Sequence, residues 1–212
     1  MIEAALFDFD GVVCDTEHQY TEFWGSQCRR YYPEQPGLEL RIKGSTLTEI
    51  YANYFASVKA EHAAITQRLN AFEEQMHFDY VPGFETFIHQ LRAHGVKTAV
   101  VTSSNQAKMA NVYRAHPDFH ELFDAILTSE DFERSKPDPD SYLKGAQRLG
   151  VKIEKCAGFE DSINGLKAVK TSGALVVGLT TTNPVEQVQP LSDIVIADFT
   201  ELDVDALLRR RA

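Results

Sequence analysis

Short apolar runs recur along the chain, and polar residues follow directly after several of them. The first run, residues 4–7, leads into Asp8, Asp10 and Gly11. Each run has the length of a buried strand, whereas the stretches between them carry apolar residues at helical spacing. This alternation is typical of an α/β fold with a parallel sheet. The runs expected to form strands are residues 4–7, 97–102, 125–128, 156–160, 174–179 and 194–196.

The stretches between the later runs predict four helices, three of which end near a glycine. Apolar residues from Phe84 to Leu91 share one helical face, and this helix should end near Gly95. The further helices expected here cover residues 106–115, 141–149 and 162–171. Alternating in this way with the strands, they favour a sheet covered by helices.

The stretch after the first strand predicts helices with no strand between them. One begins after Thr16 and continues to Tyr31, a second is expected from Thr46 to about Val58, and a third from about Ala60 to His77. The chain is therefore predicted to have a core, residues 1–15 and 81–212, and a helical insertion, residues 16–80.

Polar side chains that carry chemistry follow several of the predicted strands. Asp8 and Asp10 follow the first strand, and Glu160-Asp161 closes a later one. Right-handed crossovers place these strand ends on one edge of the sheet. The same edge should receive the run Thr102, Ser103, Ser104 and Asn105, and also Lys136, which precedes a helix.

Carboxylates at this density fit a hard cation such as Mg2+, which binds a few carboxylates together with water and a substrate phosphate. With no histidine or thiolate cluster, the set matches phosphoryl transfer through a carboxylate nucleophile. Asp8 would attack phosphorus, and Asp10 would protonate the leaving oxygen and later take a proton from water. Lys136 and Mg2+ would neutralise phosphoryl oxygens, to which Thr102 would also donate.

Four segments match, in order and spacing, the motifs of the haloacid dehalogenase superfamily. They are Asp8-x-Asp10-Gly11-Val12, Thr102-Ser103, Lys136-Pro137 and Glu160-Asp161. With its helical insertion, the chain resembles the subgroup that contains β-phosphoglucomutase and sugar-phosphate phosphatases. The resemblance implies a Rossmann-like core, a mobile helical cap, and Mg2+ bound by Asp8, the Asp10 carbonyl and Asp161. Glu160 would support or share the metal shell.

The predicted cap bears on the choice between a phosphatase and a mutase. The segment Lys43-Gly44-Ser45 resembles the mutase segment that touches the sugar phosphate, but Leu47 stands where the mutase has an arginine. Tyr20 aligns with the cap histidine of the mutase, whereas His18 lies nearby in sequence and keeps the mutase alternative open. Without a cation at Leu47 a second phosphate would be poorly held, so hydrolysis is favoured over isomerisation. The residues expected to contact substrate are Ser103, Ser104, Asn105, Lys43, Gly44, Ser45, His18 and Tyr20.

Composition narrows the class of protein. A formal net charge of -10 argues against sequence-independent binding to nucleic acid or to an anionic membrane. The three cysteines are too few and too scattered for a disulfide framework or a zinc site, and are expected to be reduced thiols. The strand that starts at residue 4 leaves no room for a signal peptide, and no apolar stretch is long enough to span a bilayer. A cytoplasmic monomer is expected.

The predicted function is that of a Mg2+-dependent phosphatase that cleaves a small phosphate ester, such as a sugar phosphate, through an aspartyl phosphate on Asp8. One alternative is a phosphohexomutase of the β-phosphoglucomutase type. A second alternative is a non-catalytic binding protein that uses the same fold. Asp10 favours phosphate esters over the other substrates of the superfamily, because its dehalogenase members lack an acid at this position.

Overall fold

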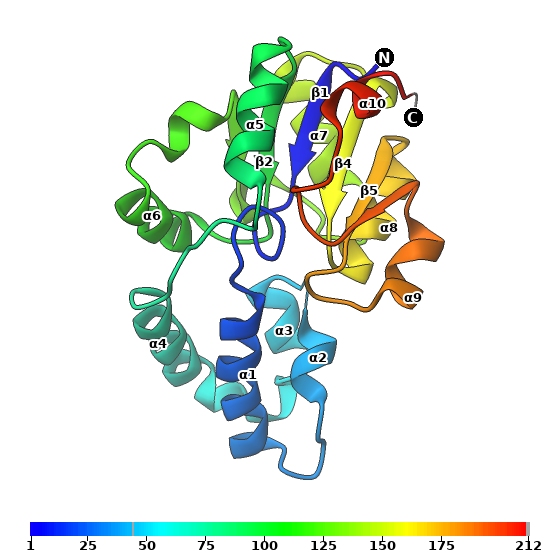
Figure 1. Ribbon diagram of the computed structural model, residues 1–212. Coiled ribbons are helices and arrows are strands. Elements are labelled where there is room, and N and C mark those ends of the chain that lie inside the picture. The colour runs from blue at the N-terminus through cyan, green and yellow to red at the C-terminus, as the bar shows by residue number, and fades with distance from the viewer. Residues whose placement is uncertain (44, 211–212) are drawn as a thin grey trace.

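The computed structural model describes residues 1–43 and 45–210. Six strands form one parallel sheet in the order β3-β2-β1-β4-β5-β6 (Figure 1). The strands are β1 (Ala4–Phe7), β2 (Lys97–Val101), β3 (Ala125–Leu127), β4 (Cys156–Glu160), β5 (Leu175–Leu179) and β6 (Ile194–Ile196). Each predicted strand is present, with ends that differ by one residue at most, so the predicted α/β class with a Rossmann-like parallel sheet is confirmed.

The register of the central strands aligns the polar residues that follow them. Phe7 of β1 pairs with Val100 of β2 on one side and with Phe159 of β4 on the other. The residues that come next therefore lie at one level, with Asp8 just past the end of β1 and Glu160 as the last residue of β4. This is the edge where parallel α/β sheets bind their ligands.

Helices cover both faces of the sheet, and successive residues of β1 point to opposite sides. Ala5 and Phe7 belong to an apolar cluster that includes Phe84 and Phe87 of α5. Ala4 and Leu6 belong to the cluster on the other face, which includes residues of α7 and α8. The helices of this part of the chain are α5 (Phe84–Ala93), α6 (Gln106–Ala115), α7 (Asp140–Leu149), α8 (Ile163–Ser172), α9 (Val185–Val188) and α10 (Val204–Leu208).

Four helices between β1 and α5 lie beyond the ends of the strands, on the side toward which β1 points (Figure 1). They are α1 (Glu17–Tyr31), α2 (Leu38–Ile42), α3 (Leu47–Asn53) and α4 (His62–Glu73). A separate apolar cluster that includes Trp24, Phe55 and Ile65 holds them together. These helices span residues 17–73 of the helical insertion predicted over residues 16–80. The division of the chain into domains at residues 15 and 80 stays a prediction.

The insertion differs from the predicted helices in three places. Helix α2 was not predicted, and it forms because Leu38 and Ile42 are buried after the break at Pro36-Gly37. The helix predicted to reach Val58 ends at Asn53, and a 3-10 segment with non-helical dihedral angles at Val58 follows. The third helix is α4, which is shorter than predicted at both ends. Short 3-10 helices occur at Ala56–Glu61, Phe119–Leu122, Ser129–Asp131, Ile153–Lys155 and Gln189–Leu191.

Two further predictions concern the cysteines and the membrane. Cys14, Cys28 and Cys156 are free and buried, as predicted for reduced thiols. Cys14 lies outside the six strands, after the turn at Gly11, and makes isolated β-bridges to Asp10 and Tyr80. Within residues 1–43 and 45–210, every helix is too short or too polar to traverse a lipid bilayer.

Candidate active site

The loop after β1 brings Asp8 and Asp10 to the edge of the sheet by a tight turn. The Phe9 carbonyl accepts hydrogen bonds from the backbone N–H groups of Val13 and Cys14. Gly11 has a φ of 72°, and a β-carbon there would collide with the Asp161 carboxylate. A glycine is therefore required at this position both by the left-handed backbone and by the close approach of the β4 loop.

Lys136 joins the ends of β1 and β4 through its ammonium group. Its Nζ lies 2.7 Å from Asp8 Oδ1 and 2.6 Å from Glu160 Oε1. The Lys136 side chain is almost completely buried. Burial by itself lowers the pKa of Lys136, but the charges of Asp8 and Glu160 outweigh it and raise the pKa above its ordinary value. Lys136 is therefore a permanent positive charge beside Asp8.

Glu160 is fully buried and surrounded by hydrogen-bond donors. In addition to Lys136, the Tyr142 hydroxyl donates to Oε1 at 2.9 Å. The backbone N–H groups of Asp161 and Ser162 and the Ser162 hydroxyl donate to Oε2. Such a set of donors stabilises the charged carboxylate and fixes its direction. Glu160 thus fixes the position of the Lys136 ammonium beside Asp8.

Three carboxylates form a cluster that could hold a metal ion. Asp8, Glu160 and Asp161 each offer an oxygen, and these oxygens lie within 4.8 Å of one another. Burial, followed by the charges of Glu17, Glu160 and Asp8, raises the pKa of Asp161 well above its ordinary value. A cation would remove this repulsion, and an all-oxygen set of acidic ligands is what Mg2+ prefers. The Thr182 hydroxyl also donates to the Asp161 carboxylate.

Asp8 has a pKa raised from 3.8 to about 7. Burial is the largest cause, the Lys136 charge opposes it, and the charge of Glu160 adds to the rise. A cation at the cluster would favour the ionised form of Asp8, which is the form that acts as a nucleophile.

Asp10 belongs to a different network. The Thr16 hydroxyl donates to its Oδ1 at 2.5 Å, and the Ser104 hydroxyl donates to Oδ2 at 2.9 Å. Lys108 Nζ lies 2.5 Å from both oxygens. The metal contact predicted for Asp10 would use its carbonyl oxygen, and its carboxylate is not part of the cluster among the described residues.

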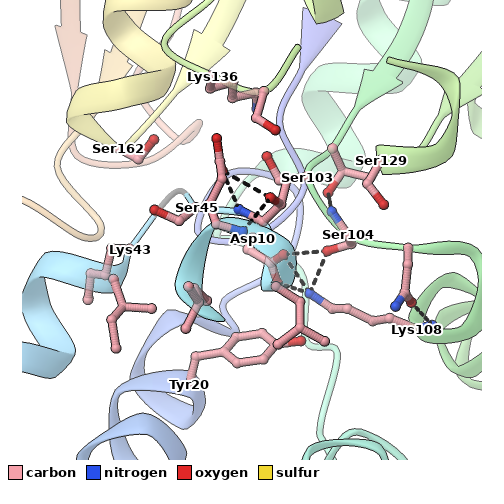
Figure 2. A pocket seen from close by; sticks show the side chains of 18 of the residues that line it. Asp10, Tyr20, Lys43, Ser45, Ser103, Ser104, Lys108, Ser129, Lys136 and Ser162 are labelled. Atoms are coloured by element: carbon pink, nitrogen blue, oxygen red, sulfur yellow. Dashed lines mark hydrogen bonds and ion pairs between the residues drawn. The ribbon is translucent and has the colours of Figure 1, made fainter. Parts of the chain in front are cut away.

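A cavity of about 560 Å3 separates the sheet edge from the helical insertion, and residues of both line it. Figure 2 shows Lys136 and Ser103 on the sheet side and Tyr20, Lys43 and Ser45 on the insertion side. The two sides together enclose a volume suited to a small metabolite.

Most of the residues predicted to contact substrate line this cavity. Those that do are Ser103, Ser104, Asn105, Lys43, Ser45 and Tyr20, as do Thr102 and Leu47. Gly44 lies outside the described residues. His18 does not line the cavity, because its exposed ring turns outward to Asp15, 3.5 Å away. The expected contact between His18 and substrate therefore has no support in this structure.

The structure adds candidate functional residues that sequence reasoning missed. Lys108 and Glu73 are buried beside Asp10 and Tyr20, and Glu17 faces Lys43 across 3.3 Å. Burial and then the Asp10 charge raise the pKa of Glu17. The sequence did contain one indication for Lys108. A lysine in the first turn of a helix interacts unfavourably with the helix dipole, so its presence there indicates a nearby anion.

Comparison with known proteins identifies the family. A sequence profile described as haloacid dehalogenase-like hydrolase matches residues 5–179. The chain belongs to this family. The four motifs at the sheet edge had indicated this same family of enzymes. The predicted resemblance is therefore confirmed.

Relatives in the family include phosphatases and mutases. Validoxylamine A 7'-phosphate phosphatase of Streptomyces hygroscopicus subsp. limoneus is 30% identical over 95% of this chain and 96% of its own length. The β-phosphoglucomutase of Bacillus subtilis is 28% identical over 97% of this chain and 94% of its own length. The crystal structure of a β-phosphoglucomutase from Clostridium difficile superposes with a TM-score of 0.81, at 21% identity, over 98% of this chain and 96% of that one. At this identity the superposition supports the fold alone.

Proposed function

We propose that this protein is a Mg2+-dependent phosphatase of small phosphorylated metabolites, in particular sugar phosphates, and that Asp8 is its nucleophile. The observation that carries the proposal is the position of Asp8. It stands at the cavity between the buried Lys136 ammonium and the carboxylates of Glu160 and Asp161. A relative with 30% identity named as a phosphatase supports the reaction type.

Mg2+ fits the residues present. Asp8 and Asp161 would bind it with the Asp10 carbonyl, and Glu160 would support the site, because five donors already occupy its oxygens. When bound, the ion would supply positive charge to the phosphoryl oxygens and keep Asp8 ionised. Lys136, which is buried and paired with Glu160, would supply a second positive charge to the phosphoryl oxygens.

The reaction would proceed in two displacements. An oxygen of Asp8 forms a bond to phosphorus as the bond to the leaving oxygen breaks, and Asp10 gives its proton to that oxygen. Water then attacks phosphorus, Asp10 takes a proton from it, and the bond to Asp8 breaks. Thr102 lines the same cavity as Asp8 and would donate to the phosphoryl oxygens.

The helical insertion would act as a cap that chooses the substrate. It supplies Tyr20, Lys43, Ser45 and Leu47 to the cavity, opposite Asp8. Closure would exclude bulk water while Asp8 is phosphorylated, and opening would release the product. A cavity of about 560 Å3 suits a sugar phosphate and excludes a folded phosphoprotein.

The cavity also bears on the mutase alternative. A mutase must hold the second phosphate of a bisphosphate, yet each lysine in the described lining already faces a carboxylate. Leu47 adds no charge, and Tyr20 donates its hydroxyl to Glu73. Hydrolysis is therefore the favoured outcome. The β-phosphoglucomutase relative at 28% identity keeps isomerisation as the second candidate.

The decisive experiment measures phosphate release with Mg2+ from a panel of sugar phosphates, nucleotides, pyrophosphate, β-glucose 1-phosphate and a phosphoprotein. Asp8→Asn is the test variant, and Asp15→Asn is the matched control, since Asp15 is exposed and does not line the cavity. We expect release that Asp8→Asn lowers at least about 1,000-fold, that Asp15→Asn leaves intact and that chelation of Mg2+ abolishes.

Each alternative has its own outcome. Glucose 6-phosphate formed from β-glucose 1-phosphate without net phosphate release would identify a mutase. No turnover of any compound would favour the non-catalytic binding protein. Comparable turnover of the phosphoprotein and of sugar phosphates would contradict the proposed role of the cap. The cytoplasmic location, the monomeric state and the lack of nucleic-acid binding stay predictions.

A further inference from the structure

Lys108 is the second buried ammonium at the site, and it is not part of the four motifs. It lies in the first turn of α6, where the partial positive charge of the helix end disfavours a cation. Even so, its side chain is only 3% exposed. A buried lysine in this position requires strong compensation, and its surroundings supply it.

The compensation comes chiefly from Asp10. Lys108 Nζ lies 2.5 Å from each Asp10 oxygen and donates to the Ser104 hydroxyl at 2.9 Å. Ser104 in turn donates to Asp10 Oδ2, and Thr16 donates to Oδ1. The three side chains leave the Asp10 carboxylate a single direction. Figure 2 shows Lys108 reaching from α6 to Asp10, with Ser104 beside both.

The helical insertion holds Lys108 from the other side. Its Nζ lies 4.5 Å from the centre of the Tyr20 ring, within the range of a cation–π interaction, and 5.2 Å from that of Phe9. The Tyr20 hydroxyl donates to Glu73 at 2.8 Å, which fixes the ring. Residues of α1 and α4 thus support an ammonium that belongs to the core.

We propose that Lys108 is a positioning residue for Asp10: it aims the carboxyl group at the leaving oxygen and stabilises the carboxylate that remains after the proton has left. This inference rests on the proposed function. In the first displacement the bond between phosphorus and the leaving oxygen breaks, the new bond to Asp8 forms, and the proton passes from Asp10 to the leaving oxygen. Negative charge then develops on Asp10, next to the Lys108 ammonium.

The choice of leaving group separates this role from a structural one. Phenyl phosphate and p-nitrophenyl phosphate have nearly the same size. The unsubstituted phenolate needs a proton in order to leave readily, whereas p-nitrophenolate leaves readily as an anion. If the Asp10 carboxyl group is misplaced, hydrolysis of phenyl phosphate should therefore slow while hydrolysis of p-nitrophenyl phosphate should not. Damage to the fold would slow both.

The experiment compares kcat/KM for the two esters in Lys108→Met, with Lys108→Arg as the conservative variant and Lys167→Met, on the exposed side of α8, as the matched control. We expect Lys108→Met to lower kcat/KM about 10- to 100-fold for phenyl phosphate and less than about threefold for p-nitrophenyl phosphate. Lys108→Arg should restore part of the loss. In an Asp10→Asn background, Lys108→Met should cost little more, because its effect passes through Asp10.

Four results would overturn the inference, and the last of them leaves the proposed function intact. One is an equal loss for both esters, and another is a full additional loss in the Asp10→Asn background. The third is a wild-type protein that hydrolyses no phosphate ester, in which case the proposed function fails as well. Activity in the wild type that depends on Asp8 but not on Lys108 overturns this inference alone.

Discussion

Gly165 passes so close to Glu160 that a β-carbon at this position would collide with the Glu160 carboxyl group. The first turn of α8 is thus packed directly against the carboxylate that holds Lys136. Since Lys136 is the positive charge beside Asp8, a residue with no side chain of its own helps to determine the site. A substitution that adds a single methyl group at Gly165 tests this contact.

Gly165→Ala should displace Glu160 and loosen its hold on Lys136. We expect a loss of about 2 kcal/mol or more in the free energy of unfolding, because an overpacked core is strained and a buried carboxylate loses donors. Phosphatase activity should fall as well. Gly25→Ala is the matched control, since Gly25 is also buried within a helix but faces only the flexible Arg29 side chain. Denaturant unfolding and the rate of phosphate release measure the two effects, and equal behaviour of the variants would contradict the prediction.

The raised pKa of Asp8 makes the metal-free protein sensitive to pH. The fold favours protonated Asp8, whose pKa is about 7 against 3.8 ordinarily. Its contribution to stability is therefore fully present below about pH 4 and is lost as the pH rises through 7. Asp8→Asn cannot lose a proton. In a chelator, its melting temperature should exceed that of the wild type by a margin that widens from pH 4 to pH 7 and is constant above.

Saturating Mg2+ should oppose this trend, because the ion stabilises ionised Asp8 and binds only the folded protein. At pH 8 the wild type should gain several degrees on addition of Mg2+, and Asp8→Asn should gain less; 1 kcal/mol corresponds to about 2–4 °C in a chain of this size. Differential scanning calorimetry at several pH values measures both effects. A margin between the two proteins that does not change with pH in the chelator would count against the raised pKa.

Lys43 offers a test of the substrate side of the cavity. Its ammonium faces Glu17 across 3.3 Å, and both side chains are largely buried. Lys43→Met keeps the alkyl stem and removes the charge, so the leaving group should bind more weakly while the chemistry at Asp8 continues. We expect KM for the preferred sugar phosphate to rise about tenfold and kcat to change less than about threefold. Lys59→Met, at an exposed position of the insertion, is the control, and an unchanged KM for Lys43→Met would exclude Lys43 from the binding site.

Leu47 is the position that should decide between a monophosphate and a bisphosphate. It lines the cavity without a charge, whereas a guanidinium there would bind a second phosphate in bidentate fashion. Leu47→Arg should lower the inhibition constant of a sugar bisphosphate about tenfold or more. Leu47→Met, which keeps the size and apolar character, is the control. Inhibition by the bisphosphate that is equally strong in the wild type would argue for the mutase alternative.

Much of the site could be predicted because it depends on strand ends. Asp8, Thr102 and Glu160 each follow or close a short apolar run, and parallel strands bring their carboxyl ends to one edge whatever the details of packing. The side chains at that edge are therefore neighbours by topology alone. Lys136 was predicted for the same reason, from its place between β3 and α7.

Only the tertiary structure decided which residues hold these groups. Lys108 projects from α6, Tyr142 from α7 and Glu73 from α4, and the direction of a helical side chain depends on how the whole helix is rotated and packed. His18 shows the same limit, because it lies two positions before Tyr20 on α1 and therefore faces the solvent and not the cavity. The sequence by itself thus determined the parallel sheet and the acidic edge, since strand pairing follows from local apolar runs. The packing of the helices determined which charges surround Asp8 and Asp10, since a buried charge is stable only where a partner from another helix pairs with it.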